Sequence, residues 1–100
     1  MAEYQITYWR ELPSLVVARD GDQVTKVPMP HRFQEAIDEA AMRLGHTSSE
    51  EYLDGWRRSS WEAGDGAVAE VAARVAGELE GSWPEPAVTA FLDRLGPATP

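Results

Sequence analysis

The stretch from residue 31 to residue 44, HRFQEAIDEAAMRL, constrains the fold more than any other part of the chain. Its apolar side chains recur at spacings of three and four residues, which places them on one face of an α-helix. These side chains are Phe33, Ala36, Ile37, Ala40 and Leu44. Pro28 and Pro30 precede the stretch and Gly45 follows it, as is typical of helix boundaries. Such a helix needs partners that cover its stripe, so the segments before and after it must supply them.

The chain of 100 residues suits a single domain with one modest core. We expect this domain to span residues 1–96, with a frayed tail at 97–100. The absence of cysteine excludes disulfides, thiolate zinc sites and cysteine nucleophiles. The fold must therefore be stabilised by packing alone.

The formal net charge is −8, because 17 acidic residues oppose 9 basic ones. Phosphate backbones and anionic membranes repel so acidic a chain. No apolar run approaches the roughly 20 residues of a membrane-spanning helix, and the first residues do not begin a signal peptide. We expect a cytoplasmic protein that binds neither membranes nor, on this charge, DNA.

The N-terminal quarter of the chain predicts three antiparallel strands. Residues 3–10 alternate in side-chain orientation as a strand does, the apolar residues 15–19 make a second strand, and residues 22–27 form the third. Asp20-Gly21 is a strong signal for a two-residue hairpin loop. With that loop, Arg19 pairs with Asp22, Val17 with Val24, and Leu15 with Lys26.

Three more helices are expected after the central one. Ser48 and Glu51 stand at capping-box spacing, which predicts a helix from residue 48 to about 58. Residues 60–62 are a candidate short strand, and two apolar stripes then predict helices that end at Gly81 and Gly96. The predicted fold class is α+β, a single domain in which a three-stranded antiparallel meander is followed by about four helices.

The sequence shows no pattern for catalysis or for a cofactor. His31 and His46 lie at opposite ends of one predicted helix, roughly 20 Å apart, so they cannot share a metal. No serine is set in a nucleophile motif, and no phosphate loop or dinucleotide fingerprint is present. We therefore expect no intrinsic enzymatic activity, no metal site and no cofactor.

The aromatic and arginine residues suggest a protein-docking surface. Four tryptophans are many for this length, and Trp and Arg are enriched at interface hot spots. The residues predicted to form the surface are Tyr8, Trp9, Arg10, Arg57 and Trp61. The alternative is that Trp56 and the tyrosines fill a small core.

Residues 24–58 resemble a ribbon-helix-helix module, in which a strand pairs with its copy in a dimer and enters the DNA major groove. That resemblance implies DNA contacts by Thr25, Lys26 and Ser48. Two observations oppose it: acidic residues outnumber basic ones over residues 22–60, and the hairpin would give this strand a partner within its own chain.

A second resemblance covers roughly residues 3–95. The segments that carry it are Ile6-Thr7-Tyr8-Trp9-Arg10, Leu12-Pro13, Arg19-Asp20-Gly21, residues 32–38 with 40–42, and Tyr52-Leu53 with Trp56-Arg57. In this order they resemble the short bacterial domain known as the virulence factor family. The family occurs alone or joined to HEAT-type repeats and a NifU-like domain, and it implies no reaction and no catalytic residue. It implies an accessory subunit of folate- or corrinoid-linked one-carbon enzymes.

We therefore expect a non-catalytic accessory or adaptor protein that docks on a larger protein. The alternatives are a ribbon-helix-helix DNA-binding regulator and a small-ligand-binding protein with a pocket between sheet and helices. The expected oligomeric state is a monomer or a homodimer.

Overall fold

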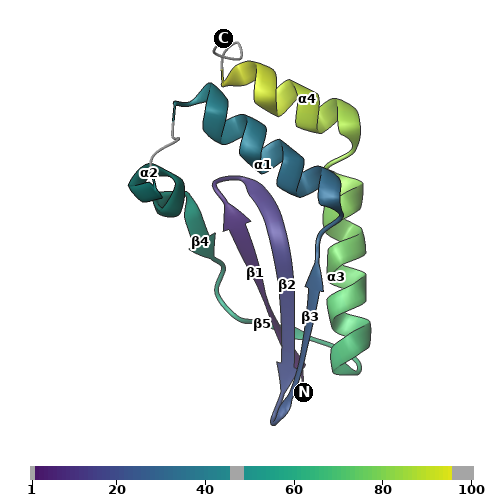
Figure 1. Cartoon of the computed structure of the whole chain (residues 1–100). Coiled ribbons are helices and arrows are strands. Elements are labelled where there is room, and N and C mark those ends of the chain that lie inside the picture. Colours follow the sequence, from purple (N-terminus) through teal and green to yellow (C-terminus); the bar gives the residue numbers. More distant parts are fainter. Residues whose placement is uncertain (1, 46–48, 96–100) are drawn as a thin grey trace.

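Three antiparallel strands form the centre of the fold, as the sequence predicts. The computed structural model describes residues 2–45 and 49–95. The strands are β1 (Ala2–Trp9), β2 (Leu12–Asp20) and β3 (Gln23–Pro28), in the sheet order β3-β2-β1 (Figure 1). Two short strands, β4 (Trp56–Arg58) and β5 (Glu62–Gly64), pair with the other edge of β1.

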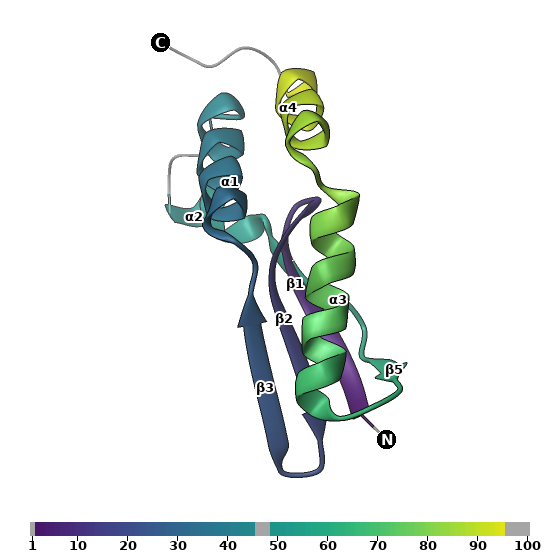
Figure 2. The same ribbon diagram turned by 90° about the vertical axis from the view of Figure 1, so that its right-hand side faces the viewer.

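The described residues form four helices, which confirms the predicted α+β class. They are α1 (His31–Arg43), α2 (Ser49–Asp54), α3 (Val68–Ser82) and α4 (Glu85–Arg94). Helix α3 lies along the sheet, whereas α1, α2 and α4 gather at the end where β1 finishes (Figures 1 and 2). The molecule is consequently long and thin, with principal extents of 48 × 29 × 19 Å.

The first of two apolar cores lies between α3 and the sheet. Successive strand residues point to opposite faces, so Ile6 and Val16, which pair directly, meet α3 together. Helix α3 contributes small apolar side chains, among them Val71, Ala72 and Val75, which are almost fully buried. This packing fixes which side of the sheet is inside.

The second core lies at the end of the sheet under α1 and α4. Trp9 and Leu12, which are paired across β1 and β2, contact the apolar stripe of α1. Phe91 of α4 belongs to this core. Trp83, at the end of α3, packs against both cores, and its carbonyl accepts a 2.7 Å hydrogen bond from Arg32 of α1.

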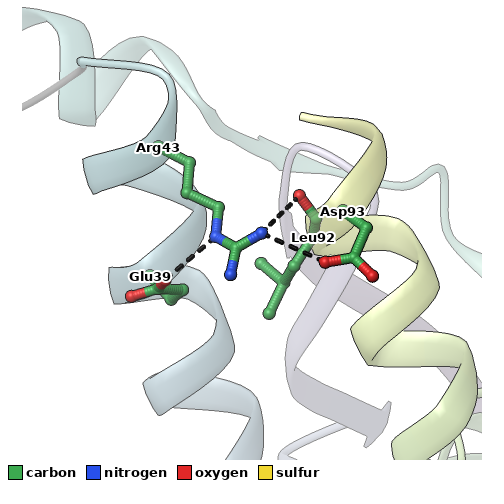
Figure 3. Close-up of polar contacts among 4 residues, drawn as sticks. All are labelled: Glu39, Arg43, Leu92 and Asp93. Carbon is green, nitrogen blue, oxygen red and sulfur yellow. Dashed lines mark hydrogen bonds and ion pairs between the residues drawn. The ribbon is translucent and has the colours of Figure 1, made fainter. Parts of the chain in front are cut away.

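An arginine ties α4 to α1 at the edge of this core. The Nε of Arg43 donates to Glu39 on the same helix (2.9 Å), and its Nη1 donates to the Leu92 carbonyl (3.0 Å) (Figure 3). Asp93 lies 3.4 Å from the same Nη1. The Arg43 side chain is only 18% exposed, so these bonds are better shielded from solvent than an ordinary surface pair.

The predicted hairpin register is wrong by two positions. Asp20 pairs with Gln23 and Arg19 with Val24, so the loop is Gly21-Asp22. Gly21, with φ +59°, takes the first loop position, where positive φ is needed and glycine accepts it without strain. A shift of two preserves the alternation, so each β3 side chain stays on its predicted face.

The region after α1 corrects two further predictions. Helix α2 ends at Asp54 rather than near residue 58, and Trp56–Arg58 form β4 because they find backbone partners on β1. The added strand expected at residues 60–62 lies at Glu62–Gly64. The predicted cap at Ser48 and the tail at 97–100 lie outside the described residues.

Pro13 lies inside β2, whereas the sequence predicts that this strand begins only at residue 15. It pairs with Tyr8 at a register shift, and Ser14 is the extra residue of the bulge. A bulge is one of the places where a sheet accepts proline. The Ser14 carbonyl accepts a hydrogen bond from the Met29 amide (2.9 Å), so the irregularity also directs the chain from β3 into α1.

The close approach of Gly55 to Trp9 predicts a local stability effect. A Cβ on Gly55 would lie 2.5 Å from Cε2 and Nε1 of the Trp9 indole. We expect Gly55→Ala to lower the free energy of unfolding by about 1–3 kcal/mol through this clash. The control Gly77→Ala adds a Cβ within α3 where no atom lies within 4 Å, and it should stabilise by about 0.5–1 kcal/mol. Urea denaturation measures both, and equal changes would contradict the packing described here.

The bond between β1 and β5 predicts a pH dependence. The Tyr4 hydroxyl donates to Glu62 (2.6 Å), and this bond, with burial and the Glu62 charge, raises the pKa of Tyr4 above its ordinary value of 10.0. This hydrogen bond contributes fully to the free energy of unfolding below about pH 10. The contribution is lost as the pH rises through the pKa of Tyr4 in the folded protein. We expect unfolding free energy in this alkaline range to fall less steeply for Tyr4→Phe than for the wild type. Equal slopes in urea denaturation at a series of alkaline pH values would refute this.

Candidate docking surface

Three of the five predicted docking residues gather where β1 meets β4. Tyr8 pairs with Arg57 in the sheet, and the Arg57 guanidinium carbon lies 4.4 Å from the centre of the Tyr8 ring. The Nε of Arg57 donates to the Arg10 carbonyl (3.0 Å). The aromatic ring and the carbonyl hold the stem of an otherwise exposed arginine in one orientation.

Arg10 turns the chain at this position. Its φ of +52° lies in the left-handed region, where a residue other than glycine is uncommon. Its amide donates to the Gly55 carbonyl (2.7 Å), which fastens the β1–β2 turn to the start of β4. Arg10 thus supports this corner with its backbone, and its side chain is half-buried beside Trp9.

Trp9 must be removed from the predicted docking surface. It is fully buried, with 0% of its surface exposed. Its Nε1 donates to the Tyr52 carbonyl (2.8 Å), and its ring lies 5.9 Å from that of Tyr52. Alternation along β1 points it to the face opposite Tyr8, where α1 and α2 cover it. It is a core residue and cannot touch a partner.

Trp61 lies apart from the other predicted docking residues. The Arg19 guanidinium carbon is 3.7 Å from the centre of its ring, and Arg19 is 3.8 Å from Glu3. Glu3 is five residues before Tyr8 on β1, a separation of roughly 17 Å in a strand. The structure therefore does not bring the five residues together as one surface.

A pocket at the β1–β4 edge is lined by Arg57 and by residues outside the five predicted ones. It has a volume of about 350 Å³ and is lined by Thr7, Trp56, Arg57 and Arg58; we call it the β4 pocket. Trp56 meets Tyr52 edge to face at 6.0 Å, and Arg57 and Arg58 are exposed. The alternative of the sequence analysis, that Trp56 fills the core, agrees with its packing against the second core. The pairing that brings Arg58 beside Thr7 is not visible in a segment that the sequence predicts to be helical. Gly55 indicates that the helix ends earlier, because glycine is common directly after the last residue of a helix.

The β4 pocket differs in charge from the groove between α1 and α4. That groove, of about 290 Å³, contains Glu35, Glu39 and Glu85 beside Arg32. The β4 pocket is lined by two arginines and no acid.

Within residues 2–45 and 49–95, no group of three or more His, Cys, Asp or Glu side chains is placed to hold a metal ion. In the same part of the chain no helix has the length and apolarity to cross a membrane.

The chain matches a known protein family. A family model described as "Virulence factor" matches residues 7–92. This range contains the complete β4 pocket. No curated protein and no solved structure matches the chain significantly.

The contrast between Trp9 and Trp61 is measurable. We expect Trp9→Ala to lower the free energy of unfolding by about 3–5 kcal/mol, because it empties a core site. Trp61→Ala removes a half-exposed ring stacked on one arginine and should cost about 1 kcal/mol or less. Urea denaturation of both variants tests this, and similar losses would contradict the assigned burial.

Proposed function

This chain belongs to the virulence factor family, and on that premise we propose that it is a non-catalytic accessory protein that docks on a larger protein in the cytoplasm. The family description names a phenotype and no reaction. The docking role is therefore argued from the chemistry of the surface. The non-catalytic role is argued from the sequence, which contains no nucleophile, phosphate-loop or dinucleotide motif.

The β4 pocket is the observation that supports docking most directly. Two exposed arginines and a tryptophan line this concave site, and the chain as a whole carries a charge of −8. Trp and Arg are the residue types that most often dominate binding energy at interfaces. Since one tyrosine ring and one carbonyl already hold Arg57, little side-chain entropy is lost when a partner binds it.

The pocket also indicates what the partner presents there. Guanidinium groups donate paired hydrogen bonds to carboxylates, while the Trp56 ring favours an apolar or aromatic contact. A volume of about 350 Å³ accommodates one or two partner side chains. A partner loop with an aspartate or glutamate beside an apolar residue fits this arrangement best.

The family resemblance directs the search for the partner to folate- or corrinoid-linked one-carbon enzymes. Turnover of one-carbon substrates by the purified chain alone would refute the non-catalytic role. The DNA-binding alternative is less well supported, because β3 already pairs with β2 from Asp20↔Gln23 to Leu15↔Pro28. Thr25 faces α3 rather than solvent, and Lys26 is exposed on the other face; Ser48 lies outside the described residues.

A variant of one pocket arginine tests the docking role. We expect Arg57→Glu to reduce capture of a stoichiometric partner from native lysate on the order of tenfold or more, since it reverses the charge at a hot-spot type of residue. The control Arg74→Glu makes the same charge change on the exposed side of α3 and should capture normally. Thermal denaturation verifies that both variants fold. Equal capture by all three proteins would eliminate the β4 pocket as the docking site.

A further inference from the structure

No helix formed by the described residues covers most of one face of the sheet. The side chains that point away from α3 include the neighbours Leu15, Val17 and Arg19 of β2, with Lys26 directly beside Val17 and Val24 beside Arg19. Helix α3 lies along the other face, and the remaining helices gather at the end of the sheet (Figures 1 and 2). We call the residues Leu15, Val17, Arg19, Val24, Lys26 and Arg58 the open sheet face.

The apolar side chains of the open sheet face lie outside both apolar cores. Leu15 and Val17 are only half-buried and Val24 is 57% exposed. None of the three belongs to, or packs against, either apolar core. Contiguous apolar residues left uncovered on a small domain are typical of an interaction site.

The charge of this face is opposite to that of the molecule. Arg58 pairs with Thr7 and so shares the face with Arg19 and Lys26. Glu3, bound to Arg19 at 3.8 Å, is the acid among the β1 residues on the same side. Arg19 is already engaged by Glu3 and by the Trp61 ring, which leaves Lys26 and Arg58, among the described residues of this face, as the cations beside the apolar centre, in a chain of net charge −8. A ligand complementary to this face is apolar in the middle and acidic at its margins.

We propose that the open sheet face binds an amphipathic α-helix of the partner, with an apolar stripe over Leu15, Val17 and Val24 and acidic residues that pair with Lys26 and Arg58. The inference depends on the proposed docking function and adds the chemistry of the partner. The open sheet face adjoins the β4 pocket through Arg58, which lines both.

The dimensions of the sheet suit a single helix. Three strands spaced by about 4.8 Å make a platform about 10 Å wide between the outer strands, close to the diameter of one α-helix. The other face of the same strands already accepts one: α3 lies on it with five buried valines and alanines. A second helix here would complete a three-layer arrangement.

Other occupants fit less well. A nucleic acid would bring its many phosphates close to the acidic remainder of the chain, whereas a helix presents only a few carboxylates. A second copy docked face to face would bring the cations of both copies together, and Lys26 opposes pairing through the outer edge of β3. An acidic helix is the occupant that charge and shape both favour.

The test uses a designed helical peptide and the complete protein. The peptide carries leucines at helical spacings of three and four, flanked by glutamates, and a matched peptide carries lysines in place of the glutamates. Amide chemical shifts of the ¹⁵N-labelled protein are followed as each peptide is added. We expect the glutamate peptide to shift the amides of Val17, Arg19, Val24 and Lys26, and the lysine peptide to leave them unchanged.

Three variants separate the contributions of charge and apolar contact. Lys26→Glu should weaken binding of the glutamate peptide on the order of fivefold, and Arg74→Glu should change it less than about twofold because Arg74 lies on α3. Val24→Thr keeps a β-branched residue in the strand and should weaken binding by removing an apolar contact. The proposal would be overturned if Lys26→Glu bound the glutamate peptide as tightly as the wild type does, or if the wild type bound both peptides equally well.

Two further outcomes would replace it. Concentration-dependent shifts of these amides without peptide would assign the face to a second copy, and shifts with a short single-stranded RNA but not with the peptide would assign it to nucleic acid. If Arg57→Glu abolishes partner capture while the glutamate peptide fails to bind, this inference fails and the proposed docking function stands. If the peptide binds while Arg57→Glu has no effect on capture, the β4 pocket fails instead.

Discussion

The burial of the Trp9 indole is the constraint on which the rest of the structure depends. Its ring lies under α1, its Nε1 is bonded to the Tyr52 carbonyl, and Gly55 approaches it too closely for any side chain. One residue of β1 thereby fixes the positions of α1, α2 and the start of β4. Because β4 begins directly after Gly55, the β4 pocket exists only where this packing is intact.

Much of the fold follows from patterns that are local in sequence. The stripe of residues 31–44 identifies α1 almost to the residue, and alternation with a glycine turn identifies β1 to β3. The stripe that includes Val68, Val71 and Val75 likewise identifies α3. Each of these elements buries one regular face, and such a face has a period that the sequence displays.

The site was less accessible to sequence reasoning, because its elements are defined by distant partners. Residues 56–58 form a strand only because β1 offers them a free edge, a cause that no local propensity contains. The burial of Trp9 has a similar origin, since a strand pattern does not say which face the helices will cover. Residue type suggested Arg57, and the pairing of β4 with β1 shows that Thr7, Trp56 and Arg58 line the same pocket.

The division of the interior into two cores has a mechanical consequence. Trp83 packs against both cores and stands at the junction of α3 and α4. The two cores also share elements, because Trp9 and Leu12 of the sheet belong to the core under α1 and α4, whereas Phe33 of α1 belongs to the core under α3. Opening of the helical end would therefore expose sheet residues as well. The β4 pocket, which lies beside Trp9, would lose its shape together with that end.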